Sequence, residues 1–463
     1  MQRFKILMII IILSVMIYPA PYRVYLLGSQ YSRKYNGIGH DSYGNIYIGA
    51  GDTWGYNGAA LFKYDVNLDS LIIVGNVKQA SVAAKNWLNG DTPGKIHTNI
   101  YEGPDGNIWF GTHSASEGVD YSGFRGGHIY RFDPSLSVLT DESAPDVAIP
   151  NQGLLAIAPA FSCSTIYSVG YPDGDIWKYD LKTRKSSFLM KSNTRLGGIS
   201  RNFFTDNKGK MYYPMNICFI CFDPTDSTRT VKGRGMSGVT QISSILFTPD
   251  KDTAYFINHG TYHLWRYIPS IDSVKDLGVA NIDNDTFSIG NLAARWDLQC
   301  LYYAPSKSGT IIEYNLKAST KKNFMTIPSV TLTGSDGTDR DGNLWFSSYG
   351  QYDDRVYKFY HNIPCSTCGT KNEISNNSNN QIVPKLRVLP NPAIDHISVI
   401  LNNLGGTFND IRIYNSLGIC VLTLSNNTNM SINIPVLKFT PGVYYLTVHN
   451  NKLSLNSRFV VFR

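Results

Sequence analysis

The sequence predicts an all-β protein in which one sheet unit is repeated, and three observations support this prediction. An aromatic residue in a short β-type segment recurs at Tyr47, Trp109, Tyr167, Tyr212, Tyr255, Tyr302 and Trp345. A second segment, whose best copies read hydrophobe-aromatic-basic-aromatic-Asp, follows at residues 61–65, 129–133, 176–180, 219–223, 264–268, 311–315 and 356–360. From residue 133 onward the copies lie 43 to 47 residues apart. Four-stranded blades of about 40 to 50 residues are typical of a β-propeller, so we predict a seven-bladed β-propeller followed by a small C-terminal β-sandwich.

Residues 95–133 show the repeated unit most clearly. They contain three predicted antiparallel strands, at residues 96–101, 108–111 and 129–132, and the sequence GPDG at residues 103–106 joins the first two. Pro, Asp and Gly favour turn dihedral angles, whereas the aromatic and β-branched residues between them suit a half-buried sheet. The other copies are expected to have the same order of strands and turns.

The N-terminal residues predict export. Residues 1–20 combine Arg3 and Lys5 with an apolar run too short to span a membrane, which is the pattern of a secretory signal peptide, with an uncleaved anchor as the alternative. The propeller is expected to cover residues 21–364. Its seventh blade ends at Tyr360 without an outer strand, so we predict that residues 23–27 supply this strand and remove the open sheet edge.

Two insertions lengthen the early blades. Residues 77–94 contain ASVAAKNWL, which favours a short helix, and residues 113–127 join two strands of the second blade. In a four-stranded meander, the loop between the second and third strands lies at the same end as the connections between blades. His97, His113 and His128 are therefore expected at one end of one blade.

Other blades should contribute to the same end of the propeller. Trp54, Tyr171, His259 and His263 lie in loops of this kind, and Arg201 is one of the polar residues of the innermost strands that are expected to face the central channel. The sequence therefore predicts a site rimmed by His, Tyr, Trp and Arg. Three imidazoles and an open fourth position would suit zinc. The alternatives are a site without a metal and histidines that only support loops, so the metal ligands stay unassigned and a divalent cation (Zn or Ca) is one option.

A resemblance to known enzymes suggests which reaction this site performs. The stretches KIHT from residue 95, DGNIWFGTH from residue 105 and GGHIYRFD from residue 126 resemble secreted bacterial propeller enzymes that act on uronic-acid polysaccharides, namely the ulvan lyases and, more distantly, the oligogalacturonate lyases. The resemblance implies a β-elimination with His113, His128, Tyr171 and either Arg201 or Arg125 as catalytic residues. The expected substrate-binding residues are His97, Arg125, Trp54, His259 and His263.

These residue types fit the implied reaction. Removal of the proton α to a uronate carboxylate requires that the charge be neutralised, by Arg or by a metal, and His or Tyr can then transfer the proton. The strand pattern also resembles the propellers of sensor proteins, virginiamycin-lyase-like proteins and gluconolactonase-like lactonases. The alternatives to a polysaccharide lyase are therefore a non-catalytic glycan- or protein-binding propeller and a lactonase-like metal hydrolase.

Charge argues against a nucleic-acid partner. The formal net charge is +7, but the excess lies mainly in the signal segment and in residues 386–463, so the propeller is about neutral and lacks a basic footprint. We expect a monomer whose partner is a polysaccharide or an oligosaccharide.

The propeller is expected to end at a flexible linker. Residues 365–385 are rich in Asn and Ser, a composition typical of such linkers. Cys365 and Cys368 in this segment would suit a small disulfide. Cys218 and Cys221 lie in one predicted strand with their side chains on opposite faces, so they are expected to stay unlinked.

Residues 386–463 have a different pattern. Apolar and polar residues alternate in the segments 397–401, 410–414, 419–424, 430–434, 442–448 and 457–462, which predicts a small antiparallel sandwich. The motifs PNPA at residue 390, IYNSLG at 413, PGVYYLTV at 441 and RFVV at 458 are similar to the type A C-terminal sorting domain of the type IX secretion system of Bacteroidota. This resemblance implies contact with the secretion machinery, export across both membranes and removal of the domain, with release or attachment at the cell surface. An accessory glycan-binding sandwich is the alternative.

Overall fold

A computed structural model describes most of the chain. The described residues are 21–32, 37–52, 57–65, 69–88, 91, 94–114, 124–192, 198–236, 241–248, 251–282, 292–294, 298–304, 309–333, 338–350, 353–361, 385–389, 393–402, 408–415, 419–427, 431–450 and 453–461. The predicted signal peptide, nearly all of the predicted linker with Cys365 and Cys368, and Trp54 lie outside these residues. Across the described ranges, the structure contains no helix that is long and apolar enough to cross a membrane.

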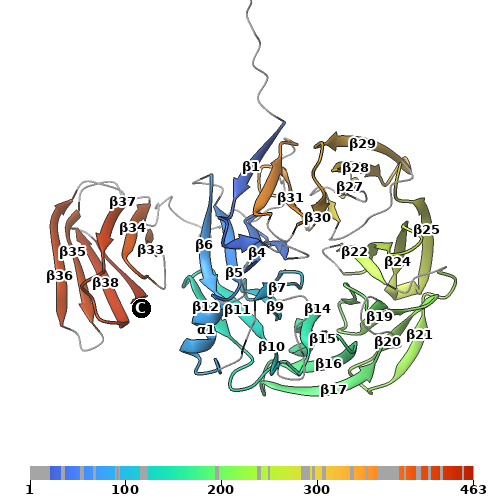
Figure 1. The fold of residues 1–463 in the computed structure, drawn as a ribbon, viewed down its shortest axis with the longest axis horizontal. Helices are drawn as coiled ribbons and strands as arrows, with labels where there is room; N and C mark the ends of the chain where they lie inside the picture. Colours follow the sequence, from blue (N-terminus) through green and yellow to red (C-terminus); the bar gives the residue numbers. More distant parts are fainter. Residues whose placement is uncertain are drawn as a thin grey trace, which may run out of the picture.

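Antiparallel sheets follow one another around a ring from residue 21 to residue 361 (Figure 1). Blade one contains β2 (Tyr31–Ser32), β3 (Ile38–His40), β4 (Ile46–Asp52), β5 (Ala60–Asp65) and β6 (Ser70–Asn76). Blade two contains β7 (Lys95–Ile96), β8 (Tyr101–Glu102), β9 (Ile108–His113), β11 (Ile129–Asp133) and β12 (Val138–Asp141), beside a ribbon of β10 (Gly126–Gly127) and β13 (Ile149–Pro150). Blade three contains β14 (Gly153–Ala160), β15 (Thr165–Tyr171), β16 (Asp175–Asp180) and β17 (Lys185–Lys191).

The remaining sheets repeat this order. Blade four contains β18 (Phe204–Thr205), β19 (Met211–Met215), β20 (Cys218–Phe222) and β21 (Arg229–Lys232). Blade five contains β22 (Ile242–Phe247), β23 (Ala254–Asn258), β24 (His263–Ile268) and β25 (Ser273–Val279). Blade six contains β26 (Ala293–Ala294), β27 (Cys300–Tyr303), β28 (Thr310–Asn315) and β29 (Thr320–Thr326). Blade seven contains β30 (Leu332–Thr333), β31 (Leu344–Ser348), β32 (Arg355–Phe359) and β1 (Tyr22–Leu26). The all-β propeller predicted from the sequence is confirmed.

The N-terminal strand completes the last blade, as predicted. β1 runs antiparallel to β32, with Tyr22 opposite Phe359. The Tyr25 ring stacks on Trp345 with 5.3 Å between the ring centroids, and its hydroxyl donates to Asp69 Oδ1 of blade one at 2.8 Å. Residues more than 300 positions apart therefore share one sheet.

A buried aspartate explains part of the repeated pattern. In three blades, the Asp that opens the turn between the first two strands accepts a hydrogen bond from the aromatic residue six positions later. The pairs are Tyr47 Oη to Asp41 at 3.1 Å, Tyr212 Oη to Asp206 at 3.1 Å and Trp345 Nε1 to Asp339 at 3.0 Å. The same carboxylates accept backbone N–H groups of the turn, for example Asn343 N at 2.9 Å. The turn and the strand aromatic are thus held by one side chain.

Blade two departs from the predicted strands in its first segment. The single strand expected at residues 96–101 is divided into β7 and β8. Between them, the Thr98 hydroxyl accepts the hydrogen bond of Gly111 N at 2.8 Å, so a side-chain oxygen replaces a main-chain carbonyl in the ladder.

The predicted helix forms in the first insertion but begins earlier than expected. Helix α1 spans Val77–Ala83, and the Asn76 side chain caps it by accepting from Gln79 N at 3.1 Å. Asn is a favoured N-cap residue. Val77 and Ala80 are buried and attach the helix to the core of the first two blades.

The C-terminal segment forms a sandwich of two sheets. One sheet has the order β33 (Lys385–Leu389), β34 (His396–Asn402), β37 (Ser431–Pro435); the other has the order β36 (Cys420–Asn427), β35 (Phe408–Asn415), β38 (Gly442–Asn450), β39 (Leu453–Val461). Its core includes Ile397, Val399, Ile411, Ile413, Leu446 and Phe459. The predicted sandwich is confirmed, and β33 is an additional strand that begins at the last residue of the predicted linker and continues into the predicted domain.

Cys218 and Cys221 are unlinked, as predicted.

Candidate functional site

The side chains of β9 alternate between two neighbouring blades. Trp109 packs with blade three, whereas Ile108 and Phe110 pack with blade one. His113 has the parity of Trp109 and therefore faces blade three. His128 adjoins Thr112 in the ladder, because Thr112 N donates to the His128 carbonyl at 3.0 Å. The two imidazoles consequently lie on opposite faces of the same sheet.

Four of the predicted site residues meet between blades two, three and four. The rings of His97 and His113 are 5.4 Å apart, and the rings of His113 and Tyr171 are also 5.4 Å apart, measured between centroids. Arg201 Nη1 lies 3.3 Å from His97 Nε2. We call His97, His113, Tyr171 and Arg201 the histidine cluster. The imidazoles are buried, while Tyr171 and Arg201 are half-buried, so the cluster has a buried floor and an edge that solvent reaches.

Hydrogen bonds fix the tautomers of both imidazoles. His97 Nδ1 lies 3.1 Å from the Leu155 carbonyl, and His113 Nδ1 lies 3.3 Å from the Ser114 carbonyl. A carbonyl oxygen only accepts, so each Nδ1 carries the hydrogen and each Nε2 carries the lone pair. For His97, that lone pair accepts from Arg201. For His113, Nε2 is the atom that can take up a proton.

The cluster is electropositive. Burial lowers the pKa of His97 well below its usual value, and electrostatic interactions with His113, Arg201 and Lys95 lower it further. Burial, followed by the charge of Lys95 and then that of Arg201, lowers the pKa of His113 to about 3. Both rings are therefore neutral at pH 7. Sequence reasoning missed Lys95, although it stands two residues before His97 and shares its face of the sheet.

A glycine makes room for His113. Gly153 opens β14 and is paired with Tyr171. A Cβ atom on Gly153 would lie 2.9 Å from carbon atoms of the His113 ring. A larger residue would therefore displace the imidazole from its position beside Tyr171.

The two histidines of blade five lie in different surroundings. His259 is exposed, and its backbone N–H donates to the Gln241 carbonyl at 3.0 Å, next to the bridge between Ile242 and Asn202, the neighbour of Arg201. Partial desolvation, followed by the charge of Arg201, lowers the pKa of His259. His263 instead lies on β24, where its Nδ1 is 2.8 Å from Asp276 Oδ2 on the outer strand β25. The structure therefore associates His259 with the cluster and does not bring His263 into it.

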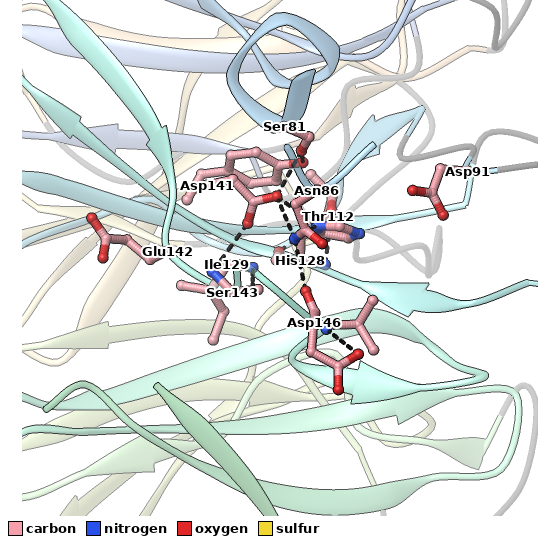
Figure 2. Close-up of polar contacts among 12 residues, drawn as sticks. Ser81, Asn86, Asp91, Thr112, His128, Ile129, Asp141, Glu142, Ser143 and Asp146 are labelled. Carbon is pink, nitrogen blue, oxygen red and sulfur yellow. Dashed lines mark hydrogen bonds and ion pairs between the residues drawn. The ribbon is translucent and has the colours of Figure 1, made fainter. Parts of the chain in front are cut away.

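His128 belongs to a second network, between α1 and blade two. Figure 2 shows His128 close to Ser81, Asn86 and Asp141. His128 Nδ1 lies 2.8 Å from Asp141 Oδ2, and the same oxygen accepts from Ser81 Oγ at 2.7 Å and from Asn86 Nδ2 at 2.9 Å. Both His128 and Asp141 are fully buried. This network attaches the insertion to the sheet and does not join His128 to His113.

Arg125 lies in the same network. Its guanidinium makes two hydrogen bonds to the Asp91 carboxylate, at 3.1 and 2.9 Å, and one to the Asn86 carbonyl at 2.6 Å. Its Nη2 also lies 3.4 Å from His128 Nε2. Of the two arginines that the sequence offered as charge-neutralising groups, Arg201 therefore lies in the histidine cluster, and Arg125 joins the insertion to blade two.

A polar chain links the innermost segments of three blades. Asn99 Nδ2 donates to Asn202 Oδ1 at 2.8 Å, and Asn202 Nδ2 donates to the Ser243 carbonyl at 3.0 Å. These contacts hold Arg201, the neighbour of Asn202, in register with blade two.

The described residues do not fit a metal centre. Among them, no group of three or more His, Cys, Asp or Glu side chains lies close enough together to hold a metal ion. In the histidine cluster, moreover, His97 Nε2 accepts from Arg201, so this nitrogen is already engaged. No chemical step is therefore assigned to zinc or calcium.

Comparisons with known proteins identify two parts of the chain. Residues 387–462 match the family described as Secretion system C-terminal sorting domain, and residues 90–114 match the family described as Two component regulator propeller. A comparison with curated proteins finds no match.

Solved structures share the fold of the chain. It is similar to a fungal alcohol oxidase solved with copper, at 11% identity and a TM-score of 0.51, over 96% of this chain and 99% of the oxidase chain. It is also similar to a chain of the mitotic checkpoint complex, at 8% identity and a TM-score of 0.50, over 73% of this chain and 91% of that one. At these identities the similarity shows the fold alone.

Together these findings define a β-propeller protein that carries a sorting domain. It is exported by the type IX secretion system to the cell surface or the medium, and its C-terminal domain interacts with the secretion machinery.

Proposed function

We propose that the propeller binds an acidic polysaccharide at the histidine cluster and cleaves it by β-elimination. The charge of the cluster carries this proposal, because the positive charges of Lys95 and Arg201 both lower the pKa of His113. Such a site favours a ligand with a negative charge, and Arg is suited to pair with a carboxylate. A uronate supplies this carboxylate next to a removable proton. All cluster residues come from one chain, so we expect the monomer to be sufficient.

Each of three cluster residues has its own role in the proposed reaction. Arg201 pairs with the uronate carboxylate, which stabilises the negative charge that develops when the adjacent C–H bond breaks. His113 Nε2 accepts that proton, and the Tyr171 hydroxyl donates a proton to the leaving oxygen. The C–O bond to the departing sugar breaks, a C=C bond forms, and no water is consumed. The bound carboxylate offsets the charge of Arg201 and thereby makes His113 a stronger base.

The test measures unsaturated product by its near-ultraviolet absorbance. The full chain is incubated with polygalacturonate, with alginate and with glucuronate-containing polysaccharides. We expect product from at least one of them, and a rate loss of about 100-fold or more in Arg201→Gln and in Tyr171→Phe. His263→Gln is the matched control and should keep the wild-type rate. Absence of product from every polysaccharide, or an undiminished rate in Arg201→Gln, would refute the lyase proposal.

A second function is favoured by one observation, the pKa of about 3 for His113. A base of this strength is far from the operating pH at which proton transfer is most efficient. The alternative is a propeller that binds an acidic glycan without cleaving it. Affinity electrophoresis in the same polysaccharides would then show retention that Arg201→Gln abolishes, with no unsaturated product.

A further inference from the structure

Lys95 is a buried cation to which the reaction above gives no role. It lies in β7, and its partner in register on β9 is His113. Directly opposed residues of an antiparallel pair project from the same face, with Cβ atoms about 4.5 to 5.5 Å apart. Lys95 is 4% exposed and His113 is 5% exposed. Solvent screens buried charges poorly, so the ammonium group acts strongly on the imidazole.

The other groups around His113 do not reverse this effect. The titratable groups at this end of the neighbouring strands include His97 just after β7, Tyr171 on β15, Asp173 in the turn that follows, Asp175 on β16 and Arg201 before β18. Two of these groups are carboxylates, and the one on β16, Asp175, interacts with Gln152 Nε2 at 2.8 Å and with Lys191 Nζ at 3.6 Å. The charges that act on His113 are those of Lys95 and Arg201, and both are positive.

We propose that Lys95 is a positioning residue of the histidine cluster, whose ammonium group, on the residue paired with His113 between β7 and β9, acts together with burial to disfavour a proton on the imidazole. The inference rests on the proposed function, since it gives the proton acceptor of that reaction its charge state. Arg201 pairs with the ligand carboxylate, whereas Lys95 lies on the floor of the cluster and acts through His113.

NMR spectroscopy of the full chain labelled at histidine tests this proposal without any ligand. The His113 signal is assigned by its loss in His113→Gln, and its titration is compared in wild type, Lys95→Met and Lys95→Arg. We expect the midpoint to rise by about 1 pH unit or more in Lys95→Met and to stay near the wild-type value in Lys95→Arg. Lys185→Met, which removes an exposed lysine of β17, is the matched control and should leave the midpoint unchanged. Lys95→Gln replaces Lys95→Met if the apolar side chain prevents folding.

Two results would overturn the inference. One is an equal His113 midpoint in wild type and Lys95→Met. The other is an equal rise in Lys95→Met and Lys95→Arg, which would indicate a packing effect and not a charge effect. Neither result would change the outcome of the lyase assay. A negative lyase assay, in turn, would not change the measured effect of Lys95 on the His113 titration, so the two failures are distinguishable.

Discussion

At the scale of single residues, the second blade holds its imidazoles in two chemically different ways. His97 and His113 bond through Nδ1 to carbonyl oxygens and lie beside cations. His128 bonds through Nδ1 to the Asp141 carboxylate and is buried with it. The first arrangement keeps an imidazole neutral and allows Nε2 to receive a proton. The second uses the imidazole to join two segments.

The neutral, buried imidazoles predict a loss of stability in acid. As the pH falls below the ordinary histidine pKa of 6.5, histidines of the unfolded chain become protonated. In the folded protein, His113 does not become protonated until the pH is near 3. Stability from this source is therefore present above pH 6.5 and decreases between pH 6.5 and 3, by about 1.4 kcal/mol per pH unit at His113. The lowered pKa of His97 acts in the same direction. The measurement is the free energy of unfolding by denaturant from pH 7 to pH 4. Carboxylates also contribute, so His113→Gln serves as the reference and should show the shallower dependence. Parallel pH dependences in the two proteins would contradict the assignment.

At the scale of elements, the strand β1 closes blade seven through one side chain in particular. Tyr25 is 8% exposed, stacks on Trp345 and bonds to Asp69 of blade one, whereas its neighbour Leu26 is 67% exposed. We expect Tyr25→Ala to lower the free energy of unfolding by about 3 kcal/mol, as for other buried aromatic residues. Leu26→Ala, on the same strand, should change it by less than about 0.5 kcal/mol. Equal effects of the two substitutions in denaturant unfolding would show that β1 does not pack in this way.

The strands could be predicted because their pattern of side chains repeats along the sequence. The face of the sheet on which each side chain lies could not be predicted. The repeat placed β1 in blade seven, since the last copy lacked an outer strand. Topology also brought His97, His113, Tyr171 and Arg201 to one end. Topology does not determine on which face of the sheet a side chain lies. The connection between β9 and β11 is long, so the sequence does not reveal the register that places His128 beside Thr112 and thus on the other face of the sheet from His113.

Charged groups were the hardest features to predict. Lys95 was missed because buried lysines are rare, although its alternation with His97 was visible in the sequence. Asp91, the partner of Arg125, lies in an insertion with no repeat to guide its placement. His263 was grouped with the site because its loop lies at the correct end, while its bond to Asp276 on the outer strand holds it elsewhere.

At the scale of the whole molecule, closure of the ring brings together side chains that are distant in sequence. His97 and Arg201 are separated by 104 positions, and their nitrogen atoms lie 3.3 Å apart. His97 belongs to blade two and Arg201 to blade four, so neither of these blades could form the site alone. The sorting domain folds as a separate sandwich with its own core, so export and the proposed ligand binding belong to different parts of the chain.

A comparison of His113→Gln with His128→Gln tests the central claim most directly, because the two residues lie on opposite faces of one sheet. Each variant is first shown to be folded by its denaturation curve, and then product formation and retention are measured on the acidic polysaccharides. We predict that His113→Gln loses turnover by about 100-fold or more. His128→Gln should unfold more readily, because it disrupts the buried bond to Asp141, yet keep turnover and retention close to wild type. Loss of turnover in His128→Gln with wild-type turnover in His113→Gln would contradict the account.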